Sequence, residues 1–198
     1  MKIIFLFLLL SAVGHCFYVP KLSPSSHHTI SKNLHFSTSK TNAGSIGKEF
    51  ITFEDDVTME ILVQKPMKQQ TNEIFNKPPI LFIHGSFHGA WCWAINWMPF
   101  FASNGYETYA INLRGTSGTG VKAKSVKIGQ HVEDIKFILK NKFSTAKPIL
   151  VGHSFGGAVV IKFLEEVSCD ENMISGASLL CSVPPYGNGP VAQRFLKT

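Results

Sequence analysis

The segment VGHSFGG, residues 151–157, places one serine between glycines, after a short apolar run and before a segment with helical spacing. A serine hydroxyl becomes a useful nucleophile only when it is exposed and paired with a base. A tight turn from strand to helix exposes it, and the helix N-terminus favours the negative charge that develops during acyl transfer. Gly152 and Gly156 stand where larger side chains would collide with the strand and the helix, and Gly157 leaves room for the helix to approach the sheet. This G-x-S-x-G pattern predicts that Ser154 is the nucleophile.

Two other interpretations of this segment are less specific. The pattern also arises by chance, in which case Ser154 caps a glycine-rich helix start or faces solvent. His153 is adjacent to the serine, but a side chain at that position points toward the sheet, so we expect it to pack there and not to act as a base. The context favours the nucleophile, because a buried strand is expected before the turn and a helix after it.

A second segment that could do chemistry is HGSFHGAWCW, residues 84–93, which follows an apolar run at residues 79–83. Its aromatic side chains favour an apolar substrate group, and His84, His88 and Trp91 are candidate substrate contacts. The two histidines are four residues apart, but glycines flank them and no glutamate motif accompanies them. We therefore do not expect a metal site here.

Residues 115–120, GTSGTG, form another glycine-rich stretch. It lacks the G-K-[ST] ending of a phosphate loop, and its glycines do not have the G-x-G-x-x-G spacing of a dinucleotide site. The four cysteines occur at irregular spacing, which indicates neither a disulfide framework nor a zinc knuckle. We expect no nucleotide, no metal and no other cofactor.

The elements that must position Ser154 follow from the apolar pattern. Continuous apolar runs predict strands buried on both faces, and apolar residues at helical spacing predict amphipathic helices. The expected strands are a hairpin at 50–53 and 57–63, then 79–83, 108–113, 148–151 and 174–183; the expected helices are 91–104, 128–141 and 155–167. Trp97 and Phe100 are expected in the core. Strands alternating with helices predict an α/β fold, with three α/β/α layers around a mostly parallel sheet.

The chain resembles the α/β-hydrolase superfamily at three places that occur in the expected order. These are HGSF at 84–87, NLRG at 112–115 and GHSFG at 152–156. Asn112 stands where the superfamily's D-x-R-G loop has a structural aspartate. HGSFHGAWCW is also similar to the opening of the plant methylesterase and hydroxynitrile-lyase branch. The resemblance implies an oxyanion hole built from the backbone amides of Phe155 and of Ser86 or Phe87.

The resemblance covers residues 50–183, about the first two-thirds of that fold, ending after the sixth strand. In the superfamily the triad acid and then the histidine follow the nucleophile. Both are therefore expected after Thr198, and the chain is expected to be a fragment that is incomplete for catalysis. The implied function is a serine hydrolase that cleaves small apolar or lipid-like carboxylic esters through an acyl-enzyme. The alternative is a non-catalytic remnant of this fold that binds an apolar ligand.

The first 48 residues differ in composition from the rest, with five lysines and no Asp or Glu. Residues 1–16 carry a lysine, an apolar run and a small-residue exit, which predict a secretory signal peptide. Residues 17–48 are rich in Ser, Thr and Lys, which is typical of a disordered transit peptide. We expect entry into the secretory pathway followed by import into a plastid, with simple secretion as the alternative. Residues 49–198 make up the partial α/β-hydrolase domain.

The formal net charge of +6 lies almost wholly in these first residues. The rest of the chain is near neutral and shows no basic stripe, which argues against nucleic acid as a partner. The N-terminal apolar run is too short to span a bilayer, so no transmembrane segment is expected after removal of the signal peptide.

Overall fold

The computed structural model describes residues 44–66, 77–116, 119, 126–167, 172–184 and 189. The predicted signal peptide and the predicted leader as far as residue 43 lie outside these described residues. The first strand begins at Gly47, so the described fold starts slightly before residue 49. Among the described helices, none is both long and apolar enough to cross a membrane.

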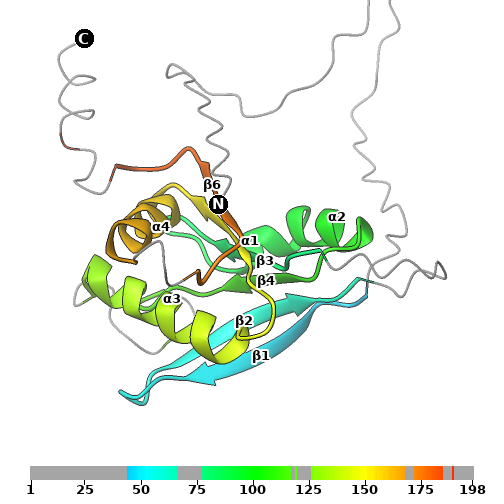
Figure 1. Cartoon of the computed structure of the whole chain (residues 1–198), viewed down its shortest axis with the longest axis horizontal. Coiled ribbons are helices and arrows are strands. Elements are labelled where there is room, and N and C mark those ends of the chain that lie inside the picture. Colours follow the sequence, from blue (N-terminus) through cyan, green and yellow to red (C-terminus); the bar gives the residue numbers. More distant parts are fainter. Residues whose placement is uncertain are drawn as a thin grey trace, which may run out of the picture.

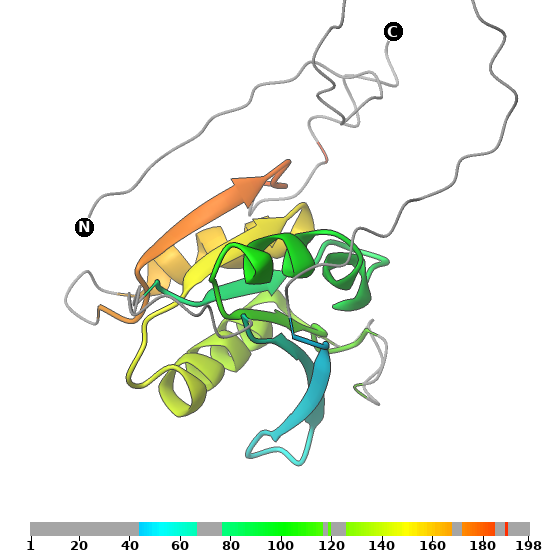
Figure 2. The same ribbon diagram turned by 90° about the vertical axis from the view of Figure 1, so that its right-hand side faces the viewer.

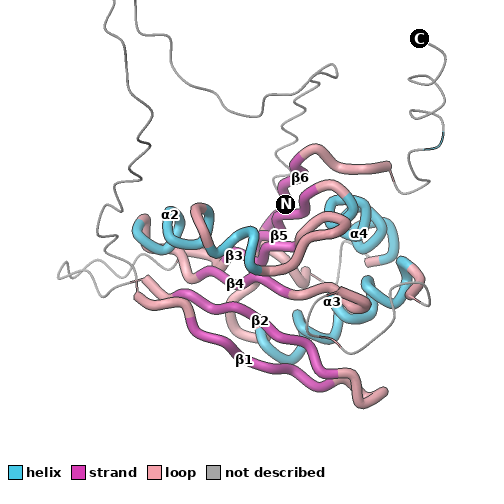
Figure 3. The backbone as a smooth tube through the Cα atoms, turned by 180° about the vertical axis from the view of Figure 1, so that it is seen from behind, coloured by secondary structure: helices cyan, strands magenta, loops and turns pink. Residues whose placement is uncertain are grey.

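A six-stranded sheet forms the centre of the described fold, in the order β1-β2-β4-β3-β5-β6 (Figure 3). The strands are β1 (Gly47–Thr52), β2 (Thr58–Gln64), β3 (Ile80–Ile83), β4 (Thr108–Ile111), β5 (Ile149–His153) and β6 (Gly176–Leu180). β1 and β2 form the predicted hairpin and β2 pairs antiparallel with β4, whereas β4, β3, β5 and β6 are parallel. This confirms the predicted α/β fold. Ile83 pairs in register with Gly152, so the segments that follow β3 and β5 lie side by side.

Helices cover both faces of the sheet (Figures 1 and 2). They are α1 (Trp91–Ala94), α2 (Trp97–Ser103), α3 (Ile128–Lys142) and α4 (Phe155–Glu166). Successive side chains of a strand point to opposite faces. On β3, Leu81 and Ile83 join the core cluster that contains α3 and α4 side chains, whereas Ile80 and Phe82 join the cluster beneath α1 and α2. The molecule therefore has the three predicted layers.

The single helix predicted over residues 91–104 is two short helices, and Pro99 explains the break. In an unbroken helix the ring of Pro99 would collide with the carbonyl of Ile95, and its missing N–H would leave that carbonyl without a partner. The chain restarts its helix at Trp97. Pro99 then falls in the first turn, where proline is tolerated.

The break also changes which side chains of α2 are buried. Met98 and Ala102 face the sheet. Trp97 is 41% exposed and Phe100 is 61% exposed. The prediction that Trp97 and Phe100 lie in the core is therefore wrong, because it assumed one continuous apolar face through Trp93.

Asn112 ties the end of β4 to α1 and to the hairpin. Its Oδ1 accepts a hydrogen bond from the backbone N–H of Ala90 at 2.8 Å, and its Nδ2 donates to Oε1 of Glu60 at 3.2 Å. The Asn112 side chain is buried. An aspartate would keep the first bond but would place a carboxylate against Glu60, so the departure from the D-x-R-G pattern suits this neighbour.

We expect Asn112→Asp to destabilise the fold by about 1–3 kcal/mol at pH 7, because the Glu60 carboxylate loses its donor and faces a like charge. Denaturant unfolding at pH 7 and at pH 4 measures this. The penalty should shrink at the lower pH, where one carboxyl group of the pair is protonated. Adding Glu60→Gln should restore most of the lost stability; an unchanged penalty in the double variant would contradict the explanation.

Candidate functional site

Ser154 lies at the turn between β5 and α4, with its backbone at φ 53° and ψ −116°. Residues with a side chain rarely adopt a positive φ unless the surroundings impose it. Here three backbone hydrogen bonds do so. The Ser154 N–H donates to the carbonyl of Leu180 at 3.0 Å, and the Ser154 carbonyl accepts from the N–H groups of Ala158 at 3.2 Å and Val183 at 3.1 Å. The turn therefore displays the side chain at its tip.

The three glycines predicted to shape this turn have no room for a side chain. A Cβ added at Gly152 would lie 2.7 Å from the carbonyl oxygen of Gly156. One added at Gly156 would lie 2.5 Å from the carbonyl oxygen of His84, and one added at Gly157 would lie 2.5 Å from Oγ of Ser182. β5, α4 and the segments that follow β3 and β6 pack against one another through these positions.

The start of α4 provides hydrogen-bond donors beside the serine. Ser154 is the N-cap residue of α4, but its side chain makes no capping hydrogen bond, which excludes the capping interpretation. The first N–H groups of a helix lack partners within the helix, and the helix dipole makes this end positive. The amide of Phe155, which we predicted to be an oxyanion donor, is the first of them.

The turn after β3 borders the serine from the other side. A Cβ added at Gly85 would lie 2.9 Å from Cβ of Ser154. The His88 N–H donates to the Gly85 carbonyl at 3.4 Å and closes the turn. Within it, Phe87 has φ 60° and a fully exposed side chain. A strained backbone carrying an exposed aromatic side chain is typical of functional sites, where the strain is part of the arrangement.

A cavity of about 480 Å³ opens beside this turn. It is lined by His84, Gly85, Ser86, Phe87, His88, Trp91, Leu113, Arg114, Gly115, Thr116, Val126, His131 and Phe155. The fold thus brings the predicted oxyanion residues and the predicted substrate contacts to one place, next to Ser154.

His84 forms the floor beneath the cavity. It is fully buried, and the Leu113 N–H donates to its Nε2 at 3.0 Å. The proton must then sit on Nδ1, which donates to the Gly85 carbonyl at 2.7 Å. Burial lowers the pKa of His84, which keeps the ring neutral. Both ring nitrogens are used within the protein, so His84 joins the turns after β3 and β4.

His88 and Trp91 form the exposed mouth of the cavity. Their rings stack with centroids 5.9 Å apart. The Nδ1–H of His88 donates to the Ser86 carbonyl at 2.8 Å. His153 is half-buried and meets the rings of His88 and Trp93 edge-on. Burial and the charge of His88 lower the pKa of His153, in keeping with a packing role.

His131 is a cavity residue that the sequence did not point to. It lies on α3, is 4% exposed, and packs edge-on against Phe155 with centroids 5.5 Å apart. Its Nδ1 has no hydrogen-bond partner among the described residues. Burial, and then the positive charge of Arg114, lower its pKa to about 4. The only sequence signal is a histidine beside the apolar positions of an amphipathic helix, which is no functional signature.

The buried His131 makes stability depend on pH. An unfolded histidine binds its proton near pH 6.5, whereas the folded chain binds it only near pH 4, so stability falls as the pH drops through this window. The loss reaches on the order of 3 kcal/mol by pH 4. We expect His131→Phe to remove this part of the acid destabilisation in denaturant unfolding between pH 7 and pH 4, and His88→Phe to leave it in place. Parallel curves of unfolding free energy against pH for the wild type and His131→Phe would contradict this.

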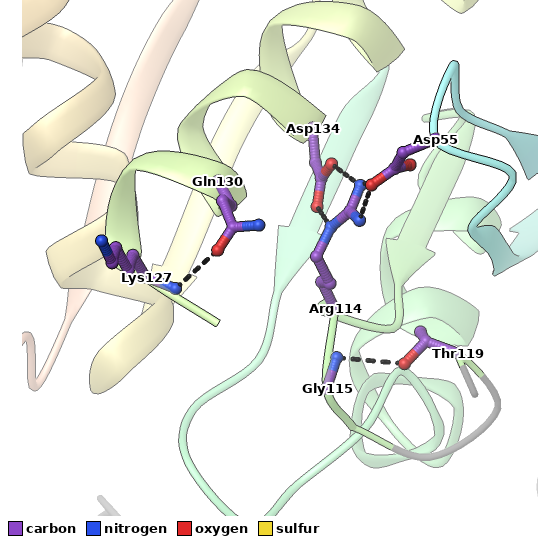
Figure 4. A network of polar contacts seen from close by, with 7 residues as sticks. All are labelled: Asp55, Arg114, Gly115, Thr119, Lys127, Gln130 and Asp134. Atoms are coloured by element: carbon purple, nitrogen blue, oxygen red, sulfur yellow. Dashed lines mark hydrogen bonds and ion pairs between the residues drawn. The ribbon is translucent and has the colours of Figure 1, made fainter. Parts of the chain in front are cut away.

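Arg114 lines the cavity, and two carboxylates hold its guanidinium (Figure 4). Its Nε and Nη2 donate to the two carboxylate oxygens of Asp134 at 2.9 and 2.6 Å, and its Nη1 pairs with Asp55 at the hairpin turn. The Arg114 hydrogen bond lowers the pKa of Asp55, and Asp134 raises that of Arg114. The cation is thus fully paired, and it fixes the loop after β4 to α3 and to the hairpin.

Comparison with known proteins places this arrangement in a family. The profile described as "Alpha/beta hydrolase family" matches residues 80–198, more than half of the chain. The chain belongs to the alpha/beta hydrolase family. This confirms the resemblance seen in the three motifs, all of which lie within the matched residues.

This alpha/beta hydrolase is similar to plant proteins. It is 30% identical over 132 residues to methylesterase 10 of Arabidopsis thaliana, a match that covers 65% of this chain and 46% of the relative. It is 31% identical over 119 residues to norfluorocurarine synthase 1 of a Strychnos species, covering 58% of this chain and 42% of the relative. The chain therefore spans less than half the length of these curated relatives.

Solved structures agree on the fold. The epoxide hydrolase VrEH1 of Vigna radiata superposes with a TM-score of 0.57 at 21% sequence identity, covering 76% of this chain and 46% of the other. At this level of identity the likeness shows the fold alone. A shared fold does not by itself determine the activity, which depends on the residues of the site.

Proposed function

We propose that this chain carries the nucleophile and the oxyanion donors of a serine hydrolase that cleaves carboxylic esters. The observation that carries the proposal is the strained backbone of Ser154, held at the uncapped N-terminus of α4. Strain of this kind persists only where the surrounding structure imposes it, and here it displays a hydroxyl beside unpaired amide donors.

The arrangement supports acyl transfer. Oγ of Ser154 attacks the ester carbonyl carbon while its proton passes to a base, and the carbonyl oxygen becomes an oxyanion. The amides of Phe155 and of Ser86 or Phe87 donate to that oxyanion. Collapse of the tetrahedral intermediate breaks the bond to the alcohol, which leaves with the proton, and water then hydrolyses the acyl-enzyme.

The base and the triad acid are proposed to lie in further sequence of the complete protein. In this family order both follow the nucleophile, and no histidine follows His153 within the 198 residues. The relatives compared above are more than twice as long as the part that matches.

A small ester with an apolar body is the proposed substrate class. The cavity mouth is aromatic, with Phe87 and Trp91 exposed and His88 stacked on Trp91. The name methylesterase, carried by relatives in Arabidopsis thaliana, supports an ester with a small alcohol group. The Strychnos relative is named a synthase, so similarity at this level extends over proteins with different names and activities.

The second candidate is a non-catalytic protein that binds an apolar ligand in the same cavity. The observation in its favour is that the mouth of the cavity is aromatic and exposed. Binding of an apolar ligand there requires no catalytic base.

A fluorophosphonate probe separates the two candidates, because it reacts covalently with an activated serine hydroxyl. Mass spectrometry of the digested protein should find the phosphonate on the peptide that contains Ser154. Saturable binding of a small apolar ester without any adduct would instead favour the second candidate.

A further inference from the structure

The cavity has two chemically different ends. Its mouth is aromatic and exposed, with Phe87 and Trp91 on the surface. Its inner wall carries three polar side chains that are almost fully buried: His84, Arg114 and His131. A buried polar group costs stability unless it is paired, so each of these three side chains needs a partner.

Two of the three are satisfied within the protein. His84 donates to the Gly85 carbonyl and accepts from the Leu113 N–H. Arg114 holds the carboxylates of Asp134 and Asp55. Both nitrogens of His84 are therefore occupied, and the charge of Arg114 is balanced by two carboxylates.

His131 is different. Its Nδ1 lacks a hydrogen-bond partner among the described residues, although the side chain is 96% removed from solvent. The ring is held in place by its edge-on contact with Phe155, the residue next to the predicted nucleophile. His131 also lines the cavity, so a ligand bound there is the partner that we consider for its imidazole.

We propose that His131 is a specificity residue that hydrogen-bonds a hydroxyl group on the bound ester. The inference deepens the proposed function and rests on it for the nature of the ligand. A neutral imidazole has one donor nitrogen and one acceptor nitrogen, and a hydroxyl group both donates and accepts. A hydroxyl therefore pairs with the unpartnered nitrogen in either tautomer. Burial and the neighbouring Arg114 charge keep the ring neutral, which matches a neutral hydroxyl group.

Two pairs of probe ligands test this: methyl 4-hydroxybenzoate against methyl 4-methylbenzoate, and the corresponding 3-substituted pair. Within a pair the ligands have nearly the same size and differ in one hydroxyl group. Dissociation constants follow from the quenching of tryptophan fluorescence, since Trp91 lines the cavity. We expect the wild-type chain to bind the hydroxy ester of at least one pair about fivefold to tenfold more tightly than its methyl partner.

His131→Phe should abolish or reverse this preference, because the hydroxyl would then lose its water and gain no partner. His131→Leu serves as a second variant in case the larger ring disturbs the packing against Phe155. The preference is a ratio, so a merely structural role of His131, which would weaken both ligands equally, does not change it. His88→Phe, at the mouth of the same cavity, should weaken both ligands and keep the ratio.

The contact between His131 and the hydroxyl group can also be tested directly on the wild-type chain. The imidazole ¹⁵N resonances of His131 should shift with the hydroxy ester and stay in place with the methyl ester. Equal affinities within both pairs, or an unchanged ratio in both His131 variants, would overturn the inference and point to a bound water as the partner of Nδ1.

The outcome is independent of catalysis. Ser154→Ala should keep the wild-type preference, because binding needs no nucleophile. A retained preference without any fluorophosphonate adduct would count against a reactive Ser154 in this chain and leave the role of His131 standing. An adduct on Ser154 without a preference for the hydroxy ester would support the proposed hydrolase and refute the role of His131.

Discussion

Replacing Ser154 with alanine is expected to abolish fluorophosphonate labelling at this position, because the variant lacks the oxygen that the probe phosphonylates. The expectation rests on what surrounds the hydroxyl and not on a complete triad. When a member of a serine-protease triad is removed, roughly 10³-fold catalysis over water remains from the oxyanion hole and binding alone, and on that basis we expect slow labelling of Ser154. The variant removes the attacking oxygen and leaves the oxyanion donors in place.

The stability of this variant should match that of the wild type. Serine and alanine carry the same Cβ, so the backbone strain at φ 53° is unchanged. Ser182→Ala is the matched control, because Ser182 lies in the same region and its Oγ already donates to the Val183 carbonyl at 3.1 Å. Labelling that survives in Ser154→Ala, or that disappears in Ser182→Ala, would assign the reactive hydroxyl to another residue.

Replacing Gly156 with alanine is expected to destabilise the fold by roughly 3 kcal/mol or more. The added Cβ would overlap the carbonyl oxygens of Ile83 and His84. Both are backbone atoms of β3 and its following turn, which cannot move without shifting the strand. Since this segment also builds the proposed oxyanion hole, labelling of Ser154 should fall as well. Urea unfolding at neutral pH measures the loss of stability.

Gly129 on α3 offers a matched control for this prediction. A Cβ added there would meet nothing within 4 Å. Alanine is favoured over glycine within a helix, so Gly129→Ala should raise stability by about 0.5–1 kcal/mol. If Gly156→Ala and Gly129→Ala unfold at the same urea concentration, the close packing of α4 against β3 does not hold.

Local pattern was enough to place most of the sheet and the serine. A strand buried on both faces requires a continuous apolar run, and the runs before His84 and before Gly152 predicted β3 and β5 to within a residue or two at each end. The glycines around Ser154 are a local steric requirement, so they too can be read without knowing the rest of the fold.

Contacts between distant segments could not be read in this way. The periodicity of residues 91–104 suggested one helix, but Pro99 broke it, and Trp97 and Phe100 are exposed. His84 was expected to face the substrate, and its two ring nitrogens are instead taken by the turns after β3 and β4.

The amino-acid sequence by itself determined the α/β fold, the position of Ser154 at a strained turn, and the family to which the chain belongs. These depend on the order of apolar runs and on glycines within a few residues of the serine. Only the tertiary structure decided which side chains line the cavity. His131 meets Phe155 because α3 packs against α4, and the pairing of Arg114 with Asp55 and Asp134 depends on how the hairpin meets α3. Such contacts depend on the packing of elements far apart in the chain, which no local spacing records.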